Sequence, residues 1–241
     1  MTSLSPSLDG VLLVDKAEGM TSHDVVALVR RKIEIKKVGH CGTLDPIATG
    51  LLLLTIGRGT KVQDLLMSED KEYAGTLTLG ITTSTQDRQG EIVNQREVLP
   101  LDESAIRAAF EKFRGDFYQL PPMVSAKKYG GVPLYKLARQ GKVVEREPRL
   151  VHVYRYAINR IALPEIDFSI LCSKGFYVRT YVHDIGEELG CGAHLKSLRR
   201  LKSGRFDVDQ AISVSQIKTV SREHILSRIL SLPEVSRMRG A

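Results

Sequence analysis

One short segment of the sequence, Gly39-His40-Cys41-Gly42-Thr43-Leu44-Asp45-Pro46, holds four reactive side chains in eight residues. Its two glycines and its proline predict irregular backbone, and irregular segments held by rigid elements often carry function. Taken alone, Asp45 is most simply interpreted as capping a turn before Pro46. The spacing of these residues therefore predicts a loop in which Asp45 could be functional, but it fits a purely structural role equally well.

Two other kinds of chemistry are open to the same segment. His40 and Cys41 are metal-binding residue types, as are Cys191 and His194, but the sequence has no Cys-x-x-Cys pair of the kind typical of structural zinc sites. Cys41 could also be a nucleophile paired with His40, although sequence neighbours in a strand or loop point apart. We expect neither a metal nor an activated thiol.

The surrounding elements must position these side chains, and the hydrophobic pattern predicts them. Apolar runs and alternation indicate strands, and stripes with helical spacing indicate helices that end near Gly115 and Gly190. Because strands and helices mix without regular βαβ alternation, we expect an α+β fold with a mixed, largely antiparallel central sheet flanked by helices and loops. The predicted strands cover residues 10–14, 51–56, 73–79, 151–161 and 168–172. The predicted helices cover residues 21–33, 102–113, 180–189 and 222–230, and the polar loops residues 38–50, 82–90 and 121–131.

Composition and charge narrow the classes of function. The chain has 241 residues, 42% of them hydrophobic, which suits one large domain or one domain with a short appendage. Three cysteines argue against a disulfide framework, and the longest apolar run is far too short to span a membrane. We therefore expect a cytoplasmic protein without a signal peptide. The net charge of +7 is concentrated in the second half, since residues 121–210 hold 16 Lys and Arg against 9 Asp and Glu, which favours a polyanionic partner.

Five motifs in order resemble those of TruB-type pseudouridine synthases. They extend over roughly residues 10–206, and the ordered set is far more specific than any one motif. The motifs are Asp15-Lys16 with Gly19-Met20-Thr21-Ser22; Gly39-His40 through Asp45-Pro46 with Ala48-Thr49-Gly50; Lys71-Glu72-Tyr73; Gln119 with Pro121-Pro122, Ser125-Ala126-Lys127, Gly130, Tyr135 and Ala138-Arg139; and Cys172 to Gly175 with Tyr177 to Thr180 and Gly192-Ala193-His194 to Arg200.

The resemblance implies a pseudouridine synthase fold and an isomerase that converts the T-loop uridine of tRNA, position 55 in tRNA numbering, to pseudouridine without cofactor or metal. It makes Asp45 the catalytic carboxylate, as a nucleophile or a stabiliser of positive charge. It makes Arg179 the cation that pairs with this aspartate, and Tyr73 the ring that stacks on the target base and takes part in proton transfer. Without the resemblance, Arg179 could be a surface charge or a phosphate contact, and Tyr73 a core aromatic.

The resemblance also implies contacts with RNA. Tyr177 and Leu198 would line the uracil pocket, His40 would lie near the flipped nucleotides, and Lys16 near the site. On spacing alone the first two would be core residues and the others surface groups. A basic cluster would hold RNA phosphates; a solvated helix face is the alternative, and the difference in charge between the two halves of the chain favours contact with RNA. The cluster comprises Lys196, Arg199, Arg200, Lys202 and Arg205, with Lys127 and Lys128 as a second group.

The sequence departs from the family pattern in three places. Ala17 replaces a usual proline, Val124 stands where an aromatic is common, and few residues follow Phe206. We expect a catalytic domain over 1–210 and a short extension over 211–241, without a complete RNA-binding domain of the PUA type. A monomer that binds the tRNA T-arm without a protein partner or a membrane is expected. An RNA-binding protein without chemistry, a guide-RNA-dependent synthase and a metallohydrolase are the alternatives.

Overall fold

The computed structural model describes residues 8–125, 128–138, 140–142 and 144–240. The chain forms two compact units: the first comprises Met1–Glu72 and Arg199–Ala241, and the second comprises Tyr73–Leu198. The chain leaves the first unit within strand β4 (Lys71–Leu79) and returns to it within strand β12 (Ala193–Ser203).

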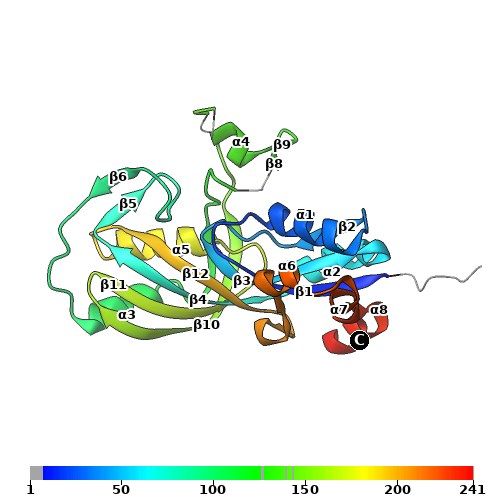
Figure 1. The fold of residues 1–241 in the computed structure, drawn as a ribbon. Helices are drawn as coiled ribbons and strands as arrows, with labels where there is room; N and C mark the ends of the chain where they lie inside the picture. The colour runs from blue at the N-terminus through cyan, green and yellow to red at the C-terminus, as the bar shows by residue number, and fades with distance from the viewer. Residues whose placement is uncertain (1–7, 126–127, 139, 143, 241) are drawn as a thin grey trace, which may run out of the picture. The chain divides into compact units, whose positions relative to one another are not determined.

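Strand β1 (Gly10–Lys16) is central to the first unit (Figure 1). It runs antiparallel to β3 (Ala48–Ile56), which also pairs with β2 (Val38–Cys41). It also pairs in parallel with β14 (Ile212–Ser213) and antiparallel with β15 (Leu230–Ser231). Alternate side chains of β1 and β3 bury an aliphatic core against Phe206.

Helix α1 (Ser22–Ile33) packs against β2 in the same unit. Thr21 begins it with a capping box to Asp24, and the apolar stripe from Val25 to Ile33 is buried. The smaller elements of this unit are η1 (Gly57–Val62), α2 (Gln63–Met67), β13 (Phe206–Asp207), η2 (Val208–Gln210), α6 (Val214–Thr219), α7 (Arg222–Ser227) and α8 (Leu232–Arg239). Helices α6 and α8 contact β1, and α6 and α7 contact α1.

The second unit is built on the strand order β12-β4-β11-β10-β7. Strand β10 (Arg149–Ala162) runs antiparallel to β11 (Glu165–Cys172) and to β7 (Gly115–Gln119).

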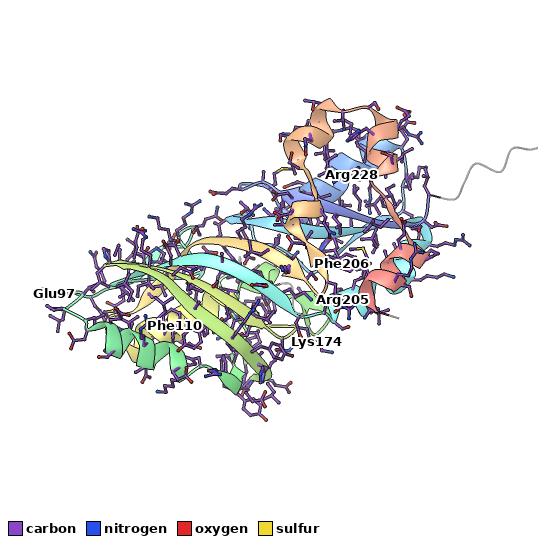
Figure 2. All side chains as sticks on the ribbon, turned by 90° about the horizontal axis from the view of Figure 1, so that it is seen from below. Glu97, Phe110, Lys174, Arg205, Phe206 and Arg228 are labelled. Carbon is purple, nitrogen blue, oxygen red and sulfur yellow. The ribbon has the colours of Figure 1, made fainter. Side chains whose placement is uncertain are left out.

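Helices α3 (Glu103–Glu111) and α5 (Val178–Glu188) pack against one face of these strands. Phe110 of α3, labelled in Figure 2, contacts the rings of Phe168 on β11 and Tyr181 on α5. The remaining elements are β5 (Ile81–Thr83), β6 (Ile92–Gln95), β8 (Lys128–Tyr129), β9 (Val132–Pro133) and α4 (Leu134–Ala138).

The α+β class and the mixed, largely antiparallel pairing are confirmed. The prediction of irregular backbone from Gly39 to Pro46 holds only in part, because β2 occupies Val38–Cys41. The strand predicted to begin at Leu51 already begins at Ala48. The end of the chain was also underestimated: the predicted helix over 222–230 ends at Ser227, and β15 and α8 follow it.

Candidate active site

The loop that joins β2 to β3 carries Asp45 and is fixed by backbone hydrogen bonds. Ala48 N donates to Asp45 O at 3.0 Å, which closes a turn through Pro46. Gly19 N donates to Pro46 O at 2.8 Å. The buried hydroxyl of Ser22 accepts from Leu44 N at 2.9 Å and donates to Leu44 O at 3.2 Å. The start of α1 therefore holds the backbone directly before Asp45.

Lys16, at the end of β1, is fully buried beside this loop. Its Nζ donates to Ala17 O at 2.9 Å, to Met20 O at 2.6 Å and to Pro46 O at 3.5 Å. Burial lowers the pKa of Lys16 to about 8, and the attraction of the Asp45 carboxylate is the largest effect that opposes this shift. The Asp45 carboxylate is thus close enough to act on the charge of this ammonium.

Arg200 fixes the same loop from β12. Its side chain is 1% exposed, Nε donates to Leu51 O at 2.6 Å and Nη2 donates to Gly42 O at 3.2 Å. The prediction that Arg200 contacts RNA was wrong, because a buried guanidinium bound to backbone carbonyls cannot reach a phosphate. Sequence reasoning missed this positioning role because charge alone does not distinguish a buried arginine from an exposed one.

The other members of the basic cluster lie on β12 or next to it, so a solvated helix face is not the explanation for them. Three of them are paired with carboxylates: Lys196 with Glu165, Arg199 with Asp15 and Lys202 with Asp207. Lys127 of the second group lies outside the described residues.

His40 lies on β2, and burial lowers its pKa to about 4, so the ring is neutral at physiological pH. Its ring meets that of His23 edge to face at 5.2 Å between centroids. The adjacent Cys41 is buried, and burial raises the pKa of its thiol to about 12. A neutral, buried thiol is a poor nucleophile, which argues against the thiol chemistry considered above.

The second unit holds Arg179 in the first turn of α5, where it is 3% exposed. Nη1 donates to Thr85 O at 2.8 Å and Nη2 donates to Val124 O at 2.7 Å, while Nε lies 3.8 Å from the Asp87 carboxylate. Arg179 is therefore not a surface charge, and loop carbonyls fix the plane of its guanidinium.

Tyr177 is the N-cap residue of the same helix and is held by Gln119 of β7. Gln119 accepts from Tyr177 N at 2.8 Å and donates to Tyr177 O at 3.0 Å, so one buried amide satisfies both backbone groups. Gln119 belongs to a motif quoted above, but its clamp on Tyr177 was not predicted. Tyr73 on β4 and Leu198 on β12 are buried with only slight exposure.

Lys16, His40 and Asp45 belong to the first unit, and the second unit holds Tyr73, Tyr177, Arg179 and Leu198. The pairing of Asp45 with Arg179 and the roles of these residues in catalysis stay predictions. Among the described residues no group of three or more His, Cys, Asp and Glu side chains could hold a metal ion. No helix in the described part of the chain is long and apolar enough to cross a membrane.

The model of the TruB family pseudouridylate synthase N-terminal domain matches residues 30–178, and that of the tRNA pseudouridylate synthase B C-terminal domain matches residues 179–232. The chain belongs to the TruB family. The TruB protein named tRNA pseudouridine synthase B in Opitutus terrae is 52% identical, over 92% of each chain. Its namesake in Geobacter sulfurreducens is 48% identical over 94% of this chain and 74% of its own length.

Solved structures of Cbf5 have a similar fold. A Cbf5 chain from a Cbf5-Nop10-Gar1 complex superposes with a TM-score of 0.73 at 27% identity, over 95% of this chain. This chain spans 62% of that one. A Cbf5 from an archaeal Nop10-Cbf5 complex gives a TM-score of 0.68 at 26% identity.

Proposed function

We propose that this TruB-family chain is an isomerase that converts the T-loop uridine of tRNA, at position 55 of tRNA, to pseudouridine. The observation that carries the proposal is the Asp45 loop, in which Lys16, Ser22 and Arg200 fix the backbone on both sides of one carboxylate. A catalytic carboxylate needs this kind of preorganisation, because the supporting groups then need not rearrange during the reaction.

The chemistry follows from the residue types. The N1–C1′ bond of the uridine breaks, the uracil turns, and a C5–C1′ bond forms, while C5 loses a proton and N1 gains one. The atoms balance without a cofactor or metal. Asp45 either attacks a carbon of the sugar or the ring, or stabilises the positive charge that develops on the sugar. Tyr73 stacks on the base and serves the proton transfer, and Arg179 holds the carboxylate ionised and aimed.

Several other residues bind the substrate. Tyr177 and Leu198 line the uracil site, His40 lies beside nucleotides flipped from the loop, and Lys16 supports the carboxylate. The protein acts in the cytoplasm as a monomer, without a protein partner. Residues 1–210 carry the catalytic residues, and residues 211–241 form a short extension that pairs with β1 of the same unit.

The direct test is incubation of the purified chain with an unmodified tRNA transcript carrying tritium at C5 of its uridines. We expect release of one tritium per tRNA and pseudouridine at position 55 only. Asp45→Asn should lower the rate at least about 10³-fold, as the loss of a catalytic carboxylate does, and leave the RNA affinity within about threefold. Product at the wild-type rate from Asp45→Asn would refute the role of Asp45, and the absence of T-loop product from the wild-type chain would refute the function.

A further inference from the structure

Helix α5 begins at a residue that is a poor helix cap. Its N-cap residue is Tyr177, whose side chain makes no capping hydrogen bond. Serine, threonine, aspartate and asparagine are preferred at this position, because their short side chains accept from the first free N–H groups of a helix. A residue that breaks a local rule of this kind usually stands there for function, and another part of the fold compensates for it.

The side chain of Gln119 compensates for it from strand β7. Its Oε1 accepts from Tyr177 N at 2.8 Å, and its Nε2 donates to Tyr177 O at 3.0 Å. The same carbonyl accepts the first hydrogen bond within the helix, from Tyr181 N at 3.1 Å. Gln119 is 1% exposed, and its backbone pairs with Arg149 of β10. A strand inside a sheet therefore carries the amide, which makes it a more rigid support than a loop.

These two hydrogen bonds to the backbone determine where the ring of Tyr177 lies. Among the residues that the structure describes, no aromatic ring packs against Tyr177 and its hydroxyl has no hydrogen-bond partner. Tyr181, one turn later, is by contrast fully buried and packs against four phenylalanine rings. Without such contacts, the position of the Tyr177 ring follows from its backbone and two side-chain dihedral angles.

Arg179, two residues later in the same helix, is held independently of Gln119. Its guanidinium donates to Thr85 O and to Val124 O. Removal of the Gln119 amide leaves both of these hydrogen bonds in place. The effect of Gln119 on the site is therefore exerted through Tyr177.

We infer that Gln119 is a positioning residue for the isomerisation, which holds the ring of Tyr177 against uracil without touching the RNA itself. The inference rests on the proposed function, in which Tyr177 lines the uracil site. Without the amide, the ring samples several positions, and only some of them contact the base. The loss then falls on the rate of the bound complex, because contacts with phosphates dominate the affinity for RNA.

The test compares Gln119→Leu, Tyr177→Ala and the double variant with the wild type. Ile106→Val is the matched control, because it removes one buried methylene from α3 of the same unit. Three quantities are measured: the single-turnover rate of tritium release at saturating tRNA, the Kd for tRNA by filter binding, and the hydrogen exchange of the Tyr177 amide by NMR.

Gln119→Leu should lower the saturating rate about 10-fold or more, as expected when a buried N–H loses its partner, and should leave Kd within about threefold. In the Tyr177→Ala background the same substitution should cost less than about threefold, because it acts through that side chain. Ile106→Val should lower the thermal unfolding midpoint and leave the rate within about twofold. Losses that multiply in the double variant, or a wild-type rate for Gln119→Leu, would overturn the inference.

The exchange of the Tyr177 amide gives a readout that does not depend on the chemistry. It should become about 10-fold faster or more in Gln119→Leu and stay unchanged in Ile106→Val, because the hydrogen bond to Oε1 protects it. Unchanged exchange in Gln119→Leu would overturn the inference. Faster exchange in a chain whose wild type forms no pseudouridine would instead refute the proposed function and leave the hold of Gln119 on Tyr177 intact.

Discussion

At the scale of the residue, buried cations organise the candidate site. Lys16 and Arg200 donate hydrogen bonds to backbone carbonyls around the Asp45 loop. Arg179 likewise donates to backbone carbonyls of loops in its own unit. Burying a charge is costly unless it is paired or hydrogen-bonded, so these contacts account for the stability of the arrangement. The exposed lysines and arginines stabilise the structure less than these buried cations do, because surface ion pairs are weak and are screened by salt.

The lowered pKa of Lys16 predicts an alkaline limit to activity. As pH rises through about 8, the ammonium loses its proton, the charge beside Asp45 disappears, and kcat/KM should fall with that midpoint. Lys16→Met should be slower by about 10-fold or more at pH 7 and should lose this limb of the profile. Single-turnover rates between pH 6 and 9 measure it.

The predicted loss of activity above pH 8 cannot result from the effect of Lys16 on the stability of the fold. Between the lowered pKa of about 8 and the ordinary lysine pKa of 10.5, the folded chain binds fewer protons at Lys16 than the unfolded chain does, so this group makes the free energy of unfolding rise with pH. A thermal unfolding midpoint measured over the same pH range separates the two effects. A pH profile of Lys16→Met identical to that of the wild type would contradict the assignment.

At the scale of the element, the close approach of β3 to β12 depends on Gly50. This residue has φ of +98°, and a Cβ here would lie 2.3 Å from Arg200 O, which is backbone and cannot move aside. Gly50 is thus required both by packing and by its positive φ. It allows the backbone of Arg200 to approach closely enough for the Arg200 side chain to reach the Asp45 loop.

Gly50→Ala should therefore lower the free energy of unfolding by more than about 2 kcal/mol, since it adds an overpacking cost to the cost of positive φ. Gly19→Ala is the control: its φ is also positive, at +81°, but no described atom lies within 4 Å of the added Cβ. It should cost about 1 kcal/mol. Urea denaturation measures both, and equal losses would show that the contact with β12 is unimportant.

At the scale of the whole molecule, the first unit is assembled from both ends of the chain. Residues after 210 supply β14 and β15 to β1, and they bury Ile217, Ile225 and Val235. A chain ending at residue 210 should consequently lose the order of the first unit. Hydrogen exchange should show β1 and β3 deprotected while β10 and β11 stay protected. Unchanged protection of β1 would show that residues 211–241 are a dispensable extension.

The sequence predicted much of the framework and less of the support around the site. Long periodic segments such as α1 and β11 were predicted because burial sets their pattern. The two-residue strands β14 and β15 were missed because they have no periodicity, only pairing partners distant in sequence. The motifs pointed to Asp45 and Arg179, but the supporting roles of Ser22, Gln119 and Arg200 were missed, since each depends on a contact that folding alone creates.

The contact between Arg200 and Gly42 has a consequence for synthesis on the ribosome. These residues are 158 positions apart. The segment that carries Gly42 and Asp45 therefore leaves the exit tunnel long before Arg200, which holds it, is translated. Domains usually fold as they emerge, but here the second unit can fold while the first still waits for its last strands. A nascent or prematurely terminated chain thus presents no ordered carboxylate to RNA, and the enzyme becomes competent only on completion.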